Sequence, residues 1–113
     1  MAFTAKALVN NELTTSFVTQ YTVPAVTVTR VTEIIACNCA GATRTITLCY
    51  VETGETADDG AGAGTNAIMK EFNLPAGTPV TLPMNSFLEA GDFISAKASG
   101  ADVTLHISGI EDA

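Results

Sequence analysis

The sequence predicts an all-β fold, an antiparallel β-sandwich of jelly-roll-like type with about eight short strands. Three observations predict it. Threonine and valine are abundant, and both side chains suit a pleated, half-buried surface better than a helix. Apolar and polar residues alternate along several short segments, as they do in half-buried strands. Turn-forming residues separate these segments at intervals of roughly 8–12 residues.

Length and composition indicate one domain. The chain has 113 residues, enough to bury one hydrophobic core, and we expect a single β-sandwich domain over residues 1–113. No apolar run approaches the ~18–20 residues that a membrane span needs. Residues 1–6 contain neither a basic stretch nor a long apolar one. We therefore expect no secretory signal, no membrane partner and synthesis inside the cell.

The charge balance argues against nucleic-acid binding. The chain carries 5 basic and 12 acidic residues, a net charge of −7. Nucleic-acid binding needs lysine and arginine to neutralise phosphates. The five cations are also scattered along the chain: Lys6, Arg30, Arg44, Lys70 and Lys97. We expect no nucleic-acid partner.

The first apolar segment of the chain ends at a turn predicted at Asn10-Asn11. It contains Phe3, Leu8 and Val9, and we interpret it as the first core strand. A docking arm is the alternative interpretation. The next strand ends at Pro24, which cannot donate a ladder hydrogen bond.

Alternation at residues 26–29 indicates the start of another strand. From Val31 the apolar pattern becomes nearly continuous through Ile34-Ile35-Ala36-Cys37. Such a run is typical of a central strand, a bulge or a strand covered on both faces. We expect residues 40–43 to close a hairpin between residues 34–39 and the following strand.

That following strand, residues 44–51, places Ile46, Leu48 and Tyr50 on one face. Residues 55–66 are rich in glycine, alanine, aspartate and threonine and form the longest expected loop. Residues 65–72 are the only segment that could be helical, and we interpret them as a strand.

The last third of the chain is punctuated by two predicted turns, at residues 74–79 and 89–92. Residues 103–108 then alternate strictly. This pattern turns Val103, Leu105 and Ile107 inward and Thr104, His106 and Ser108 outward. Pro79 and Pro83 belong at an edge or a strand end for the same reason as Pro24.

The three cysteines suggest no metal site. Cys37 and Cys39 are two residues apart and so share a face, while Cys49 lies on the next predicted strand. Structural zinc sites usually pair their ligands at C-x2-4-C spacing in turns, and His106 is the only histidine. We expect reduced, buried thiols that pack as small hydrophobes. A disulfide from Cys49 to either partner is the alternative.

No other cluster matches a known chemical motif. His106 has no nucleophile near it in sequence and faces outward. The acidic residues at 52, 55, 58 and 59 do not follow calcium-loop spacing, so a solvated loop is favoured over a weak cation site. Residues 60–64, Gly-Ala-Gly-Ala-Gly, lack the strand, helix and lysine of phosphate-binding loops. We assign no catalytic, cofactor-binding or metal-binding residue and expect no enzyme.

Several segments in order resemble a protein family. They are Leu13-Thr14-Thr15-Ser16, Tyr21-Thr22-Val23-Pro24-Ala25, Arg44-Thr45-Ile46-Thr47-Leu48-Cys49-Tyr50-Val51, Asn66-Ala67-Ile68, Leu74-Pro75-Ala76-Gly77, Leu88-Glu89-Ala90-Gly91-Asp92-Phe93-Ile94-Ser95-Ala96-Lys97-Ala98-Ser99 and Val103-Thr104-Leu105-His106-Ile107-Ser108-Gly109-Ile110-Glu111. Together they resemble small β-sandwich virion structural proteins of tailed bacteriophages, of the capsid decoration or cement type. Such proteins commonly carry a glycine soon after the Tyr-Thr-Val-Pro-Ala element, whereas Val26 follows directly here.

The resemblance implies a function without catalytic residues. A cement protein binds the major capsid protein or other virion proteins by shape and contact, is made in the host bacterial cytoplasm and ends in the virion. Proteins of this kind often form homotrimers, which would also cover edge strands. A tail, baseplate or fibre component is one alternative. A carbohydrate-binding β-sandwich module is the other, although the chain has no tryptophan and only two tyrosines to form a sugar platform.

Overall fold

The computed structural model describes residues 3–58 and 66–113, and these form eight strands. Their bounds are β1 Phe3–Glu12, β2 Val18–Thr22, β3 Val28–Asn38, β4 Arg44–Val51, β5 Ala67–Leu74, β6 Pro79–Leu88, β7 Phe93–Ala98 and β8 Val103–Asp112. In the described residues there is no helix, and hence none that could span a membrane. Residues 65–72, the helix candidate, contribute to strand β5 from Ala67 onward.

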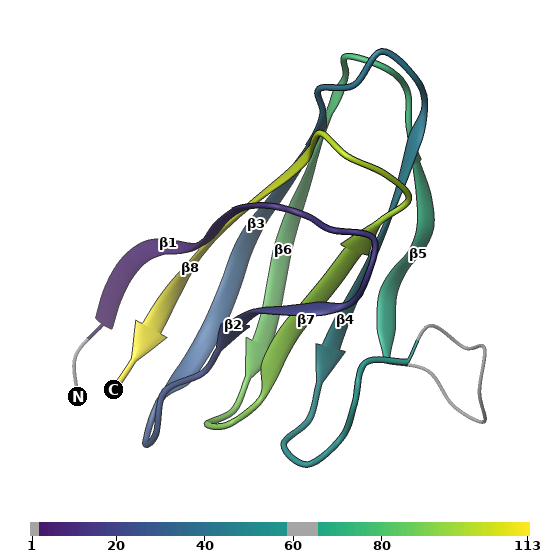
Figure 1. Cartoon of the computed structure of the whole chain (residues 1–113). Coiled ribbons are helices and arrows are strands. Elements are labelled where there is room, and N and C mark those ends of the chain that lie inside the picture. The colour runs from purple at the N-terminus through teal and green to yellow at the C-terminus, as the bar shows by residue number, and fades with distance from the viewer. Residues whose placement is uncertain (1–2, 59–65) are drawn as a thin grey trace.

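The strands form two four-stranded antiparallel sheets, in the orders β1-β8-β3-β6 and β2-β7-β4-β5 (Figure 1). The pairs β1–β8, β2–β7, β3–β6 and β4–β5 are nested, as if one long hairpin had been rolled into a sandwich. Eight strands in two facing sheets with this connectivity make a jelly roll. The predicted all-β sandwich is therefore confirmed.

The core lies between the sheets and follows the alternation in the sequence. Val103, Leu105 and Ile107 of β8 are buried, whereas His106 and Ser108 are exposed, as predicted. In β4 the predicted inner residues Ile46 and Leu48 are fully buried. Its other face is buried as well, at Thr47, Cys49 and Val51, and the Cys49 thiol contacts the Asp58 carbonyl oxygen.

Strand β3 explains the continuous apolar pattern after Val31. It lies between β8 and β6, and its register shifts between Val31 and Glu33, which marks a bulge. At the beginning of the strand the usual pattern is reversed, because polar side chains face the core and apolar side chains face outward. Thr27 and Thr29 are buried, and Val26 and Val28 are exposed.

Two predicted turns were wrong. Residues 40–43 do not close a hairpin, because β3 and β4 belong to different sheets and this segment crosses between them. Asn10-Asn11 lies inside β1, where both residues pair with β8. The predicted turns at residues 74–79 and 89–92 are confirmed, with Gly77 and Gly91 at positive φ.

The sheet edges match the proline positions. Pro79 begins the edge strand β6, Pro83 lies opposite the β3 bulge, and Pro24 follows β2. At the lower end of Figure 1 the two chain ends lie side by side, since Phe3 pairs with Asp112. The β2–β3 and β6–β7 turns meet at the same end through the Gly91 N–Val23 O hydrogen bond (3.1 Å).

Candidate docking surface

The structure separates the three cysteines. Cys37 and Cys39 share a face at the end of β3 with their sulfur atoms 3.7 Å apart, as their spacing predicts. Cys49 is buried in the other sheet, and none of the three forms a disulfide. The prediction of a buried thiol is confirmed for Cys49 and is wrong for Cys39, which is exposed.

The other residues singled out in the sequence do not assemble into a chemical site. His106 is exposed on β8. In residues 3–58 and 66–113, no group of three or more His, Cys, Asp or Glu side chains could hold a metal ion. Asp59 and the glycine-rich residues 60–64 lie outside the described residues.

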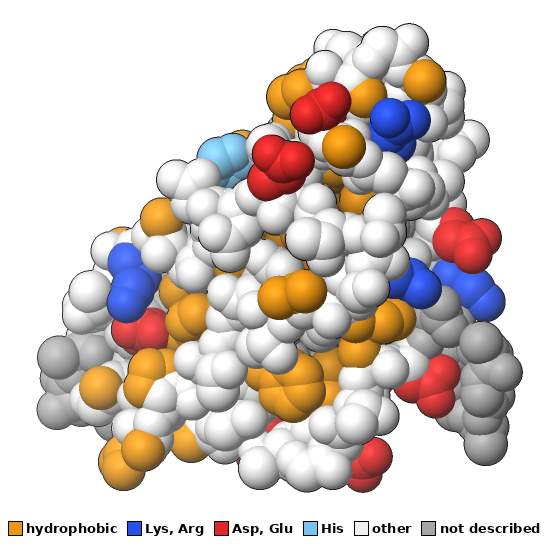
Figure 2. Space-filling model, viewed as in Figure 1, with side chains coloured by type: hydrophobic (Ala, Val, Ile, Leu, Met, Phe, Trp, Pro, Cys, Tyr) orange, Lys and Arg blue, Asp and Glu red, His pale blue; other side chains and the backbone are white. Residues whose placement is uncertain are grey.

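Exposed apolar side chains gather at the end of the molecule that carries both chain ends. Here Phe3 is 73% exposed, Phe87 64% and Val28 44%. They line a hollow of about 140 Å³ on the outer face of the β1-β8-β3-β6 sheet, whose lining residues are Phe3, Val28, Arg30, Phe87, Ile110 and Asp112. We call these six residues the terminal patch. Figure 2 shows hydrophobic side chains reaching the surface at this end, at its lower left.

Strand pairing explains how residues distant in sequence form the terminal patch. Val28 pairs with Asp112, which pairs with Phe3, so all three side chains leave the sheet on one face. Two residues further along β3, Arg30 pairs with Ile110 and with Phe87, and these three side chains leave the sheet on the same face. The patch therefore lies on rigid strands and not on a loop.

Val26 extends the apolar surface from the neighbouring β2–β3 turn. It is 89% exposed and has a φ of 56°. Positive φ is a genuine outlier for a β-branched residue and costs of order 1–3 kcal/mol. Val26 directly follows Ala25, where the resemblance stated above led us to expect a glycine nearby.

An acidic rim borders the terminal patch. Phe87 also lines a second, open depression together with Glu52, Glu89 and Asp92. The Asp92 carboxylate already accepts hydrogen bonds from the backbone N–H groups of Thr53 and Glu89. One exposed aromatic ring thus lies between an apolar hollow and a group of carboxylates.

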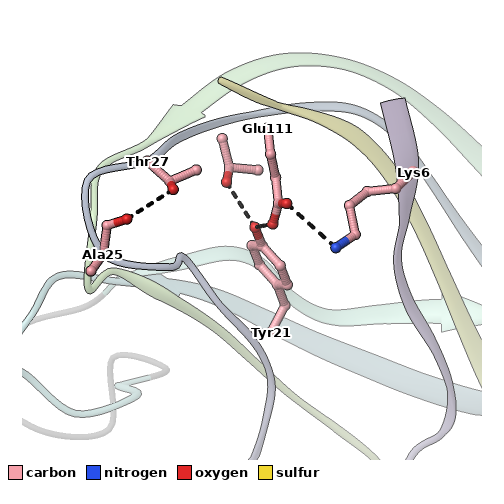
Figure 3. Close-up of polar contacts among 6 residues, drawn as sticks. Lys6, Tyr21, Ala25, Thr27 and Glu111 are labelled. Carbon is pink, nitrogen blue, oxygen red and sulfur yellow. Dashed lines mark hydrogen bonds and ion pairs between the residues drawn. The ribbon is translucent and has the colours of Figure 1, made fainter. Parts of the chain in front are cut away.

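A polar cluster lies on the face of the β1-β8-β3-β6 sheet opposite the terminal patch (Figure 3). Tyr21 of β2 donates a hydrogen bond to Glu111 of β8 and contacts the Thr29 hydroxyl of β3 at 2.8 Å. Lys6 of β1 binds the other Glu111 oxygen at 3.4 Å. Burial and the hydrogen bond to Glu111 raise the pKa of Tyr21 to about 12, while the Thr29 contact opposes the shift. The cluster joins the two sheets directly beneath the terminal patch.

Asp112 has one carboxylate oxygen without a hydrogen-bond donor. Its Oδ1 atom is buried and receives no hydrogen bond from any described residue. A buried oxygen of this kind costs free energy. The arrangement as a whole resembles a binding surface, with an apolar centre and a polar rim.

Sequence reasoning found little of this surface. The sequence analysis placed Phe3 in a first core strand, with a docking arm as the alternative. It assigned no docking role to Val28, Phe87 or Ile110. The inverted phase at residues 26–29 was the available signal, because two valines alternate there with two threonines. Thr27 and Thr29 share a face with buried Val31, so the threonines face the core, where Thr29 contacts Tyr21.

Comparison with known proteins adds information on the fold. No protein-family model matches the chain, and no curated protein matches it in sequence. The solved "Structure of infectious bursal disease virus Gx strain" contains a similar chain, with 13% identity and a TM-score of 0.52. The match covers 97% of this chain and 32% of that one, so this chain spans about a third of that protein's length. At this identity the likeness shows a shared β fold.

A second solved structure is a pentameric capsid protein isolated from metagenomic phage sequences. It shares 16% identity over 91% of this chain and 58% of that chain, with a TM-score of 0.31.

Proposed function

We propose that this protein is a phage virion structural protein, of the capsid decoration or cement type, that binds the head shell through the terminal patch. The observation that carries the proposal is the exposed apolar surface of Phe3, Val28 and Phe87 on rigid strands. Contiguous apolar surface with a polar rim marks interaction sites in soluble proteins. The proposal involves no catalytic step.

The fold is compatible with this role and does not by itself require it. Jelly rolls serve in viral capsids and also in lectins and cupins. One fold hosts many functions, so the function has to be argued from the surface. The similarity to a chain of the infectious bursal disease virus structure supports the proposal at the level of fold.

The charges define the chemistry of the proposed partner. The chain carries a net charge of −7, and Glu52, Glu89 and Asp92 border the terminal patch. The complementary surface therefore has an apolar socket for Phe87 surrounded by lysine or arginine. We propose that the major capsid protein supplies it, since complementary charge increases both specificity and association rate.

The direct test is binding to isolated heads of the virus that encodes this chain. The variant Phe87→Ser removes an exposed ring, and Val18→Ser, at 46% exposure on β2, is the matched control on the other sheet. We expect stoichiometric binding of the wild type and the control, and binding weakened about tenfold or more by Phe87→Ser, as for an interface hot spot. Both variants alter exposed side chains and should unfold at nearly the wild-type temperature.

Each result has a defined meaning. Absence of stoichiometric binding by the wild type would overturn the decoration function. Equal binding by Phe87→Ser and the wild type would overturn the terminal patch as the docking surface. Binding to isolated tails in place of heads would favour a tail, baseplate or fibre component.

A carbohydrate-binding function finds less support. A polar groove on the β2-β7-β4-β5 sheet is lined by Thr15, Thr45, Thr47, Glu71, Lys97, Ala98 and Ser99. It offers hydroxyls and charges but no aromatic face among its lining residues, and sugars favour stacking on aromatic rings.

We also propose that the protein assembles as a homotrimer, which would cover exposed edge strands.

A further inference from the structure

Two thiols lie in direct contact at the end of β3, far from the terminal patch along that strand. The Sγ atoms of Cys37 and Cys39 are 3.7 Å apart. Cys39 is exposed and Cys37 is partly buried, so solvent reaches the pair. The proposed docking function makes no use of them.

Asn38, between the two cysteines, holds the backbone in place. Its side chain is fully buried and donates hydrogen bonds to the carbonyl oxygens of Ala42 (2.8 Å) and Leu74 (2.9 Å). Its Oδ1 accepts a hydrogen bond from the N–H of Ala40 at 2.9 Å. Because the side chain of Asn38 points inward, its two neighbours both point outward.

Main-chain hydrogen bonds fix the same segment from two further sides. The Asn38 N–H donates to the Thr78 carbonyl oxygen at 3.0 Å, and the Cys39 N–H donates to that of Asp102 at 2.7 Å. The crossover to β4, the β5–β6 turn and the β7–β8 turn therefore all support these three residues. The dithiol is preorganised on a rigid element, which is what a precise binding site requires.

The sulfur separation is close to the one that a metal site requires. A disulfide would bring the sulfurs to about 2.05 Å, and two residues of extended strand place their Cα atoms near the upper limit that disulfides tolerate, about 6.8 Å. In a tetrahedral zinc thiolate site with Zn–S bonds of about 2.3 Å, neighbouring sulfurs lie about 3.8 Å apart. The observed 3.7 Å matches an edge of that tetrahedron.

We propose that Cys37 and Cys39 bind one thiophilic divalent cation, of the zinc and cadmium class, through both thiolates. Both thiols lose their protons on binding, so each metal ion releases two protons to solvent. Water fills the remaining coordination positions, because no third His, Cys, Asp or Glu among the described residues is placed to complete a metal group. His106 lies on the same outer face but pairs with Ile35 and is not a ligand.

The C-x-C spacing departs from the C-x2-4-C pattern usual in zinc sites, whereas the structure places the two sulfurs 3.7 Å apart, close to the separation in a tetrahedral thiolate site.

The test is cadmium titration of the full-length protein, reduced with a phosphine, and the readout is thiolate-to-cadmium charge-transfer absorbance in the ultraviolet. We expect the absorbance to saturate at one cadmium per chain and zinc to displace it competitively. Cys39→Ser and Cys37→Ser should each abolish most of the absorbance at the same cadmium concentration. Cys49→Ser, which changes a buried thiol on the other sheet, is the matched control and should retain it.

Three results would overturn the site. They are no saturable absorbance in the wild type, equal absorbance in Cys39→Ser, and dependence of the absorbance on Cys49 instead. Loss of two titratable thiols in the purified, unreduced protein would show that the pair forms a disulfide and would likewise contradict the proposal. All of these measurements use the free protein, so they stand apart from any result with isolated heads.

Discussion

Val26 combines two features that are rarely found together in a β-branched residue, a φ of 56° and an 89% exposed side chain. The other described non-glycine residues with positive φ are Glu71 and Asp102. Aspartate tolerates the left-handed region through local hydrogen bonds, but valine has no such compensation. Strain retained at an exposed apolar residue beside the terminal patch supports a role for Val26 in docking.

We predict that Val26→Gly stabilises the free protein by about 1 kcal/mol, because glycine adopts positive φ without steric cost. Chemical denaturation would show a higher midpoint at an unchanged slope. The control Ala25→Gly, at a neighbouring exposed residue without positive φ, should lose stability. A Val26→Gly protein less stable than the wild type would contradict the strain argument.

At the scale of elements, the two sheets are joined by hydrogen bonds as well as by apolar packing. Tyr21 on β2 reaches across the sandwich to Thr29 on β3 and Glu111 on β8. Thr29 faces inward together with buried Val31, and alternation therefore places Val28 outward, on the terminal patch. The tyrosine hydroxyl thus joins the two sheets on the side of β3 opposite the proposed docking residues.

We predict that stability falls as the pH rises from about 10 to about 12. Burial raises the pKa of Tyr21 to about 12 in the folded protein, whereas an unfolded tyrosine titrates near its ordinary value of 10.0. Within that window the unfolded chain loses the proton and the folded chain keeps it, which favours unfolding. Burial also raises the pKa of Tyr50, so that residue contributes in the same direction.

Urea denaturation of the wild type and Tyr21→Phe across this pH range measures the contribution of Tyr21. We expect the variant to be less stable near neutral pH, because the hydrogen bonds to Glu111 and Thr29 are lost. Its stability should then fall less steeply above about pH 10. Identical pH slopes for the two proteins would contradict the role assigned to Tyr21.

At the scale of the whole molecule, the sandwich leaves four edge strands, β1 and β6 in one sheet and β2 and β5 in the other. Pro79 and Pro83 blunt β6, and β2 is short. The ten-residue edge strand β1 contains no proline and carries Phe3 of the terminal patch. Burial of this edge between subunits would be favourable.

We predict that the free protein is a trimer in solution. Size-exclusion chromatography with light scattering should give three times the mass of one chain, independent of dilution over the working range. A strict monomer would contradict the trimeric form of the proposal while leaving docking through the terminal patch open to the head-binding test.

Much of the secondary structure followed from the sequence, because period-two alternation is a local property. Residues 103–108 and 44–51 form strands with the predicted inner faces, and the continuous pattern after Val31 corresponds to a central, bulged strand. The hairpin predicted at residues 40–43 was wrong because strand pairing is not local. Two consecutive strands joined by a short turn can pair or can enter different sheets, and alternation is the same in both cases.

Residue type and spacing are enough to predict an all-β sandwich, prolines at sheet edges or strand ends and an outward His106, because these features are local. Spacing also places Cys37 and Cys39 on one face. The jelly-roll order comes from the tertiary structure, which pairs Phe3 with Asp112 across nearly the whole chain. That long-range pairing assembles the terminal patch, and the hydrogen bonds of buried Asn38 hold the segment between the two sulfurs. Local periodicity fixes which way a side chain points, while strand pairing and buried polar contacts fix what it meets.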